Sequence, residues 1–309
     1  MSSRRRPLFA SRKRRTWKRS ALIVALIVNG ALAMTWFALD WIVPERSART
    51  ARDHGPVHVH GLGMNPKDQG LFLTTHTGLW RVAADDGKAT RVAERREDIM
   101  GFTVEGSDRF LGSGHPDLRD NLPPLLGLIR SRDSGRNWTR VSLLGQADFH
   151  VIRRSGKRIY GFDSYRERFL VSRDSGRTWA KGRSLGGLID FVVSSKDSRR
   201  LLASSAVGMS GSADEGASWQ NISEKRGFLA WPLPDRLYLL NGRGAVLVSP
   251  DGGRRWRQLG EIGGRPAAFL ATTRDALYAA LHNGVIKQSR DAGASWAVRY
   301  DPRLGTLPP

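Results

Sequence analysis

Short apolar runs recur along most of the chain at intervals of about 40 residues, and polar stretches rich in turn residues separate them. Within each interval the same order returns. Leu71–Thr75 is followed closely by Gly78–Val82, and Ala276–Ala280 is followed by Gly284–Lys287 in the same way. Short apolar runs bounded by turn signals are typical of β-strands. The pattern therefore predicts an all-β unit that is repeated along the chain.

An eight-residue pattern, Ser-x-Asp-x-Gly-x-x-Trp, marks five of these units, and its Trp residues lie 41, 40, 37 and 40 residues apart. This spacing matches one four-stranded blade of a β-propeller and is too long for a leucine-rich or ankyrin repeat. The Asp-x-Gly element predicts a hairpin turn. We expect the Gly to adopt positive φ, the Asp to accept hydrogen bonds from turn amides, the Ser hydroxyl to tie the strands, and the Trp ring to cover the turn. The structural residues of the five copies are Asp133 and Trp138, Asp174 and Trp179, Asp214 and Trp219, Asp251 and Trp256, and Asp291 and Trp296.

A sixth unit precedes the five marked ones. The segment from Val57 to about Val92 aligns with the others through Gly78-Leu79-Trp80 and the turn at Asp85-Asp86-Gly87, although it lacks the complete pattern. Six units of about 40 residues then fill Val57 to Tyr300. We therefore predict an all-β, six-bladed β-propeller, with seven blades as the alternative if the chain ends supply a further closing strand.

The N-terminal region predicts a membrane anchor. Residues 1–20 hold nine Lys or Arg and no acid, and the 19 residues Ala21–Leu39 that follow are largely apolar. Such a segment can span a bilayer, and its basic flank should stay in the cytoplasm, which would put the propeller on the outer face. A cleaved signal peptide with a site near Ala31–Ala33 is the alternative, and Arg14-Arg15 resembles a twin-arginine signal. The predicted organisation is a basic cytoplasmic tail (1–20), a transmembrane signal-anchor (21–43), a linker (44–56), the propeller (57–302) and a C-terminal tail (303–309).

Composition and charge narrow the choice of partners. The absence of Cys excludes disulfides, thiolate metal sites and Cys nucleophiles. The formal net charge is +21, of which nine charges belong to the basic tail, and residues 21–50 are balanced, so residues 51–309 carry +12. The basic charge of the propeller favours an anionic glycan, a cell-wall polymer or a protein as partner, besides the membrane. The predicted location outside the cytoplasm disfavours nucleic acid.

Six of the seven His residues map to one face of the predicted propeller, opposite the hairpin pattern. The candidate ligand-binding face consists of His58, His60, His76, Asp98, His115, Asp117, Asp148, His150, Asp163 and His282. His58 and His60 are two apart on a predicted strand and should point to one side, as should Asp148 and His150. Imidazole with carboxylate suits a transition metal such as zinc, copper, iron or manganese. The candidate metal ligands are His58, His60, His76, His115 and His150. The alternatives are His side chains bonded to backbone and water, and acid–base catalysis with Asp98 or Asp163 orienting a His.

The eight-residue pattern resembles the Asp-box, or bacterial neuraminidase repeat, of sialidases, sortilin-type receptors and photosystem assembly factors. The segments His58-Val-His60-Gly-Leu-Gly and Asp98-Ile-Met100-Gly-Phe102 resemble exported bacterial propellers described as sialidase-like or glycosylhydrolase-family. The resemblance implies a propeller with the Asp-boxes at the blade periphery, away from the site. The aromatic-Arg-Ile-Pro motif that marks the first catalytic Arg of sialidases is missing from the sequence.

The sequence thus favours a membrane-anchored extracytoplasmic module that binds a ligand, metal or partner at a His-rich channel mouth. The alternatives are a sialidase-like glycosidase acting on cell-surface glycans and a metal-dependent enzyme. A glycosidase needs a pair of acids, or a Tyr with a Glu, in one pocket. A metal site needs at least three His or Asp donors that converge on one point.

Overall fold

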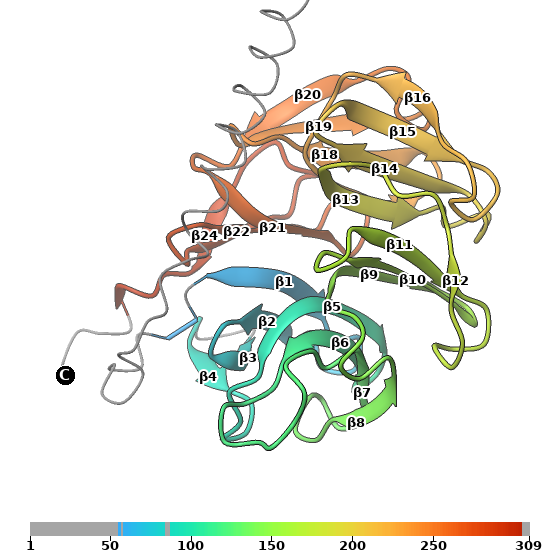
Figure 1. Ribbon diagram of the computed structural model, residues 1–309. Coiled ribbons are helices and arrows are strands. Elements are labelled where there is room, and N and C mark those ends of the chain that lie inside the picture. The colour runs from blue at the N-terminus through green and yellow to red at the C-terminus, as the bar shows by residue number, and fades with distance from the viewer. Residues whose placement is uncertain (1–54, 57, 84–86, 305–309) are drawn as a thin grey trace, which may run out of the picture. The chain divides into compact units, whose positions relative to one another are not determined.

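The computed structural model describes residues 55–56, 58–83 and 87–304, and these fold into six four-stranded antiparallel sheets (Figure 1). The predicted six-bladed β-propeller is confirmed. Within these residues no helix has the length and hydropathy needed to cross a membrane. The apolar segment 21–43, which the sequence predicts to do so, lies outside the described residues.

Each blade is built from four strands that are consecutive in the chain. The first three blades are β1 (Val59–Met64), β2 (Leu71–Thr75), β3 (Gly78–Val82) and β4 (Ala89–Arg91); β5 (Asp98–Gly106), β6 (Arg109–His115), β7 (Leu128–Ser131) and β8 (Thr139–Ser142); and β9 (Phe149–Ser155), β10 (Arg158–Asp163), β11 (Arg168–Ser172) and β12 (Ala180–Lys181). The last three are β13 (Leu188–Val193), β14 (Leu201–Ser205), β15 (Gly208–Ser212) and β16 (Gln220–Ser223); β17 (Phe228–Leu233), β18 (Arg236–Leu240), β19 (Ala245–Ser249) and β20 (Arg257–Glu261); and β21 (Pro266–Ala271), β22 (Leu277–Leu281), β23 (Ile286–Ser289) and β24 (Ala297–Tyr300).

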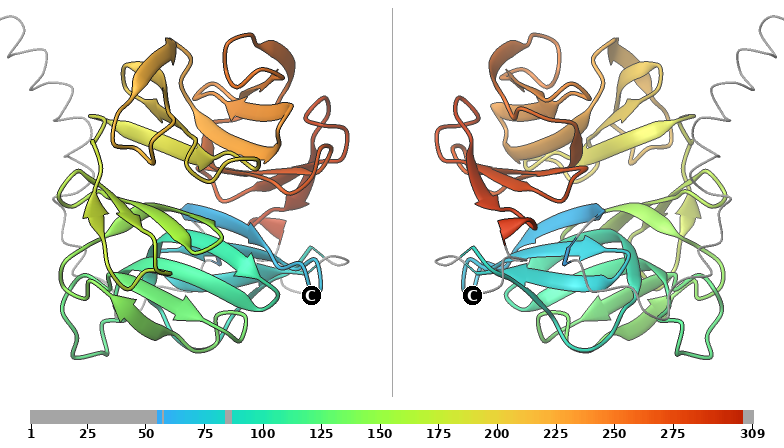
Figure 2. Two further views of the ribbon diagram at one scale, coloured as in Figure 1. Left: turned by 90° about the vertical axis from the view of Figure 1, so that its right-hand side faces the viewer. Right: turned by 90° about the vertical axis from the view of Figure 1, so that its left-hand side faces the viewer.

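The first strand of every blade lines the central channel. The strands β1, β5, β9, β13, β17 and β21 contact one another in that order, and β21 contacts β1 to close the ring. Figures 1 and 2 show the sheets placed one after another around this centre. Each sheet is one continuous stretch of chain. The seam, where the last blade meets the first, therefore contains no strand that belongs to both blades. Arg299 donates a hydrogen bond to the carbonyl of Ala83 across it.

The core lies between neighbouring blades, where the apolar faces of adjacent sheets meet. Phe72 of the first blade packs edge-to-face on Phe110 of the second, with ring centroids 4.8 Å apart. Phe169 and Phe191 make the same contact between the third and fourth blades at 5.2 Å. Aromatic pairs of this geometry stabilise the folded state by more than the burial of their apolar surface alone would. The blades are therefore held together mainly by aromatic and aliphatic side chains that the alternating strand pattern turns inward.

The Ser-x-Asp-x-Gly-x-x-Trp segments form compact turns between the third and fourth strands. In the first copy, Ser131 Oγ donates to Asp133 Oδ1 at 2.8 Å and accepts from the Gly135 amide at 2.8 Å. Ser134 and Gly135 have φ of 61° and 85°, and the Asn137 amide donates to Asp133 Oδ1. The Ser hydroxyl therefore closes its own turn and does not tie two strands together as expected. The same Ser–Asp and Gly–Ser bonds recur in the other four copies.

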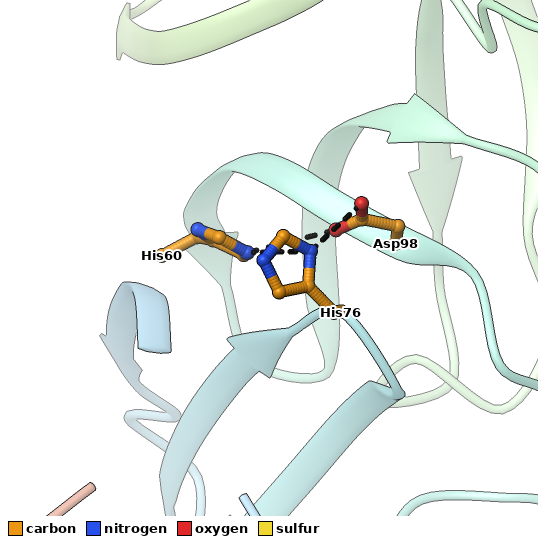
Figure 3. Close-up of side chains that lie close together, drawn as sticks. All are labelled: His60, His76 and Asp98. Carbon is orange, nitrogen blue, oxygen red and sulfur yellow. Dashed lines mark hydrogen bonds and ion pairs between the residues drawn. The ribbon is translucent and has the colours of Figure 1, made fainter. Parts of the chain in front are cut away.

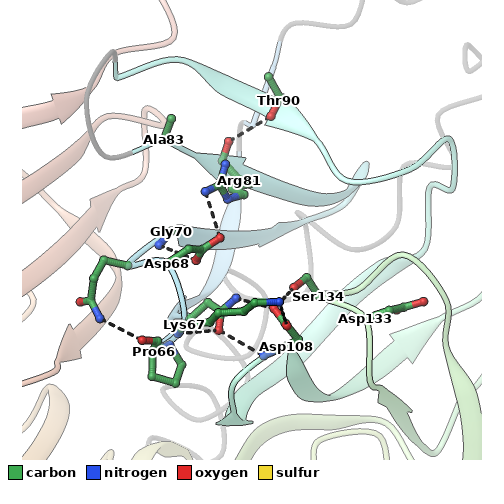
Figure 4. Close-up of polar contacts among 12 residues, drawn as sticks. Pro66, Lys67, Asp68, Gly70, Arg81, Ala83, Thr90, Asp108, Asp133 and Ser134 are labelled. Carbon is green, nitrogen blue, oxygen red and sulfur yellow. Dashed lines mark hydrogen bonds and ion pairs between the residues drawn. The ribbon is translucent and has the colours of Figure 1, made fainter.

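These turns also fasten the blade to its own first hairpin. The Ser134 amide donates to the Asp108 carbonyl at 3.0 Å. Equivalent bonds join Ser175 to Lys157, Glu215 to Arg199, and Ala292 to Asp275. In the second blade the Asp108 carboxylate also accepts from Ser134 Oγ, Asn65 Nδ2 and Lys67 Nζ, the last at 2.6 Å (Figure 4). The recurring turn thus has a structural role. It lies at the end of the sheet opposite to the starts of the inner strands.

We expect these turns to make stability fall in acid. Hydrogen bonds from the Ser218 and Ser295 hydroxyls, followed by those from the same residues' amides, lower the pKa of Asp214 and Asp291 to about 2. In the unfolded chain an Asp titrates at about 3.9. A lowered folded-state pKa gives stability that is complete above the unfolded value and is lost as the pH falls through the folded one. Urea midpoints measured from pH 5 to 2 should therefore drop between pH 4 and 2, and the Asp214→Asn/Asp291→Asn variant should show a shallower drop. An identical pH slope in the variant would contradict this assignment.

Candidate functional site

Bulges at the start of the inner strands place the His side chains of the channel mouth. The β1–β2 register passes from Val59 to Gly61 and leaves His60 unpaired, and the β9–β10 register leaves His150 unpaired in the same way. A bulge breaks the strict alternation of side chains and re-aims the extra residue. Met100, Ile189 and Ala267 occupy the equivalent bulges of the second, fourth and sixth blades. The residues at these bulges are therefore polar or sulfur-bearing in the first three blades and apolar in the fourth and sixth.

A first donor set, consisting of His60, His76 and Asp98, gathers between the first and second blades (Figure 3). His60 comes from the β1 bulge, His76 from the turn between β2 and β3, and Asp98 from the start of β5. His76 Nδ1 lies 3.2 Å from His60 Nε2 and 2.9 Å from Asp98 Oδ2, and His60 Nε2 lies 3.6 Å from Asp98 Oδ1. One potential ligand atom from each residue lies within 4.8 Å of the other two.

The surroundings of this set favour the neutral form of His60 and the ionised form of Asp98. Burial, followed by the charge of His76, lowers the pKa of His60 to about 4 and keeps its imidazole neutral near pH 7. Burial raises the pKa of Asp98, but the hydrogen bond and charge of His76, with the charges of His60 and His115, outweigh it and leave the pKa lowered. Asp98 Oδ1 is buried and has no hydrogen-bond partner. The carboxylate is therefore ionised while one of its oxygens is unsatisfied.

A second donor set, consisting of His115, Asp148 and His150, lies between the second and third blades. Asp148 Oδ2 lies 3.0 Å from His150 Nε2 and 3.6 Å from His115 Nε2. The Asp148 side chain is only 3% exposed, and its Oδ1 has no hydrogen-bond partner. His115 Nδ1 lies 2.9 Å from the carbonyl oxygen of Pro124. The long connection between β6 and β7 thus fixes the orientation of this imidazole.

The other predicted residues of this face do not join either set. Asp117 accepts from the Arg119 guanidinium and the Arg96 amide, and the Arg119 hydrogen bond lowers its pKa despite burial. Asp163 is fully buried beneath Arg168 and accepts from the Asp148 amide. Burial, followed by the charge of Arg265, lowers the pKa of His282 on the sixth blade. His58 precedes β1 with φ of 55°, and its ring centroid lies 5.6 Å from that of His76.

Sequence reasoning missed two contributors to the mouth. Met100 lies at the second-blade bulge, and aligning Asp98-Ile-Met100-Gly with His58-Val-His60-Gly would have given it the position that His60 occupies in the first blade. The Pro124 carbonyl that holds His115 is a backbone atom in a connection of twelve residues, for which no side-chain pattern exists. Below the mouth, His60 and His150 line a cavity of about 180 Å³ together with Phe102, Phe162, Ile189 and others.

Three Tyr residues, Tyr160, Tyr238 and Tyr278, do not provide an activated nucleophile of the kind a sialidase uses. The Tyr160 hydroxyl donates to the carbonyl of Ser198 at 2.6 Å, and burial raises its pKa to about 12. Tyr238 donates to the carbonyl of Arg274 in the same way, and burial raises its pKa too. Burial likewise raises the pKa of Tyr278. These three side chains are part of the packing between blades.

Comparison with known proteins supports the fold and no finer assignment. The chain matches no model of a protein family and no curated protein. Among solved structures, it is similar to the GH74 xyloglucanase from Xanthomonas campestris (TM-score 0.54, 19% identity, 79% of this chain and 45% of that one). It is also similar to the GH74 enzyme of Niastella koreensis (0.56, 13%, 79% and 45%). A chain of the nidogen/laminin complex aligns with a TM-score of 0.60 at 14% identity over 76% of this chain and 94% of that one.

The shared architecture is a β-propeller. The chain covers less than half the length of the two GH74 enzymes. Identities of this size show the fold alone. Propellers of this fold therefore include glycoside hydrolases and a member of a protein complex, and the site itself must distinguish between such functions.

Proposed function

We propose that this protein is a membrane-tethered propeller outside the cytoplasm that holds a transition-metal ion at its channel mouth and uses it to bind a ligand or partner. The observation that carries the proposal is the convergence of His60, His76 and Asp98, whose ligand atoms lie within 4.8 Å of one another. Imidazole and carboxylate together suit zinc, copper and related divalent ions.

The distances within the first donor set fit a metal centre. Ligands at about 2.0–2.1 Å from a tetrahedral ion are separated by about 3.3 Å. The two imidazole nitrogens lie 3.2 Å apart, and they face different oxygens of the same carboxylate, His76 Nδ1 at 2.9 Å from Asp98 Oδ2 and His60 Nε2 at 3.6 Å from Asp98 Oδ1. The donors come from two strands and a tight turn of adjacent blades, so little backbone movement is needed to close them on an ion. Such preorganisation lowers the cost of binding.

The protonation states also fit. A metal ion competes with protons for its ligand atoms. A site whose ligand atoms carry no proton therefore binds the ion more tightly at neutral pH. His60, with a pKa of about 4, and the ionised Asp98 have no proton to lose near pH 7. A single proton on His76 Nδ1 can serve both neighbours, since this nitrogen lies within hydrogen-bond distance of each.

Three protein ligands leave a coordination position open. A donor atom from a small ligand or from a partner side chain could complete it at the mouth. The basic N-terminal segment supports tethering to the outer face of the membrane. The nidogen/laminin complex, in which a chain of the same fold belongs to a protein assembly, supports a protein partner. The resemblance of the turns to Asp-boxes supports a place for this chain among exported propellers.

The glycosidase alternative is less well supported by the site. A glycosidase needs two carboxyl groups free to act as acid, base or nucleophile. Of the predicted acids on this face, Asp117 and Asp163 are paired with Arg119 and Arg168. Asp98 and Asp148 are paired with His side chains. The acids of this face thus serve as ion-pair partners or candidate metal ligands.

The test uses the full-length, tag-free protein in detergent, titrated with Zn²⁺ after removal of metal by a chelator. We expect the His76→Ala/Asp98→Asn variant to weaken binding at this site by more than about 100-fold, because even loss of a group that supports a ligand costs 10–100-fold. The matched control is His282→Ala, which removes a His from the same face and should bind as the wild type does. Zn²⁺ binding that is unchanged in His76→Ala/Asp98→Asn would overturn the proposal.

A further inference from the structure

The channel has a second, larger cavity at the end opposite to the His-rich mouth. It lies where the inner strands end, and its volume is about 590 Å³. Cavities of about 300–1,000 Å³ are typical of sites for small organic molecules. All six blades contribute to its wall, through residues that include Met64, Glu105, Arg154, Val193, Trp231 and Leu270. The cavity therefore belongs to the channel and not to a single blade.

Most of the cavity wall is apolar. Trp231 and Pro232 come from β17, Leu270 from β21 and Met64 from β1. The Trp231 indole is partly buried, and its N–H donates to the Pro234 carbonyl in a long hydrogen bond of 3.4 Å. An indole ring at a cavity wall offers a flat apolar surface on which another ring or an aliphatic group can pack. This part of the cavity suits the apolar body of a ligand.

The second and third blades give the cavity a charged side. Its charged residues are Glu105 of β5 and Arg153 and Arg154 of β9. Arg153 donates to Asp190 Oδ1 at 2.7 Å, and Arg154 Nε lies 3.2 Å from Glu105 Oε1. Arg130 also pairs with Glu105, at 2.9 Å. Three guanidinium groups thus face two carboxylates, which leaves a net positive charge on this side.

Burial decides which of these charges a ligand would meet. The Glu105 side chain is 5% exposed, whereas that of Arg154 is 30% exposed. Asp190 and Arg153 show the same contrast, at 4% and 28%. The guanidinium groups are therefore the charges that are accessible from the cavity. A guanidinium has five N–H donors, and one carboxylate occupies only part of them. The others can bind an anionic group through charge-assisted hydrogen bonds.

We propose that this cavity binds a small organic anion, whose apolar body packs against Trp231 and whose carboxylate, sulfonate or phosphate group binds Arg154 and Arg153. The wall combines a broad apolar surface with a few charged donors, as sites for such ligands do. The cavity lies at the other end of the channel from His60 and His76, so this inference does not depend on the metal ion of the proposed function.

The test compares two probes that differ in charge. Naphthalene-2-sulfonate is an aromatic anion, and naphthalene-2-sulfonamide is its neutral counterpart. Each is titrated by calorimetry into the full-length, tag-free protein in detergent after removal of metal, and the heat measured with detergent alone is subtracted. We expect the wild type to bind one sulfonate per chain, about tenfold more tightly than the sulfonamide, the low end of what a charge-assisted hydrogen bond contributes.

Three variants locate the binding site. Arg154→Gln should weaken sulfonate binding by about tenfold and leave sulfonamide binding unchanged, because Gln lacks the charge. Glu105 keeps its pair with Arg130 in this variant. Ala271→Trp, at the end of β21, should abolish binding of both probes because the new side chain fills the cavity. The matched control Arg243→Gln removes an exposed Arg between β18 and β19, and it should bind both probes as the wild type does.

Two results with the wild type alone would overturn the proposal: no binding of either probe, and equal affinity for both. Unchanged sulfonate binding in Arg154→Gln would overturn it too, and so would unchanged binding in Ala271→Trp that circular dichroism shows to be folded. If Ala271→Trp does not fold, the wild type and Arg154→Gln still decide. Since the protein is free of metal throughout, these results leave the Zn²⁺ site at the mouth to its own test.

Discussion

Replacement of Asp190 by Ala is expected to lower the free energy of unfolding by about 3 kcal/mol, the lower end of the range for breaking a buried ion pair. Asp190 Oδ1 accepts from Arg153 at 2.7 Å and from the Phe191 amide at 2.8 Å, and Oδ2 accepts from the Leu229 amide at 2.9 Å. One carboxylate thus joins β9, β13 and β17, the inner strands of three blades. Its loss leaves a guanidinium and two amides without their acceptor in the channel wall.

Urea unfolding monitored by Trp fluorescence measures this effect. Asp235→Ala is the matched control, because Asp235 also pairs with one Arg, Arg274, but both side chains are substantially exposed. Exposed pairs contribute little to stability, so this control should unfold like the wild type. Equal midpoints for Asp190→Ala and the wild type would show that the carboxylate does not hold the blades together.

Gly114→Ala is expected to damage both the fold and the first donor set. Gly114 has φ of 146°, and a Cβ at this position would lie 1.9 Å from the Asp98 carbonyl oxygen and 2.9 Å from the Met100 amide nitrogen. Backbone strain and overpacking each cost about 1–3 kcal/mol. To make room, the start of β5 must move away from β6 and carry the Asp98 carboxylate with it. We therefore expect a stability loss of roughly 2–6 kcal/mol and weaker Zn²⁺ binding in the protein that still folds.

The control for this change is Gly186→Ala, since a Cβ there meets no atom within 4 Å. It should leave both the urea midpoint and Zn²⁺ binding as they are in the wild type. If Gly114→Ala kept full affinity for Zn²⁺, then the position of Asp98 would not matter for binding. That result would speak against its place in the first donor set.

The repeat made the fold predictable, because a turn with four fixed residue types shows both its local geometry and the length of the blade. The face on which the His residues gather was predictable for the same reason, since blade alignment gives each residue a place along its strand. The predicted domain limits, membrane anchor and ligand remain predictions, and residues 21–43 lie outside the described part of the chain.

The grouping within that face could not be predicted. Strand alternation puts His58 and His60 on one side, but a bulge at His60 breaks the alternation, and the sequence carries no marker for it. The acids were equally ambiguous. Asp98 and Asp163 look alike in sequence, yet one faces two imidazoles and the other is paired with Arg168. In a chain so rich in Arg, only the folded arrangement shows which carboxylates are already neutralised.

The last and first blades close the ring without sharing a strand, so the gene could be rearranged to move the termini of the chain. Since every sheet is one uninterrupted stretch of chain, moving the termini to another connection between blades would leave all six sheets intact. Circular permutants opened at such connections should therefore fold, and the present seam has no privileged status. The two donor sets draw on three consecutive blades. An opening between the fourth and fifth blades would keep those blades covalently continuous, whereas an opening after the first blade would separate His60 and His76 from Asp98 in the chain.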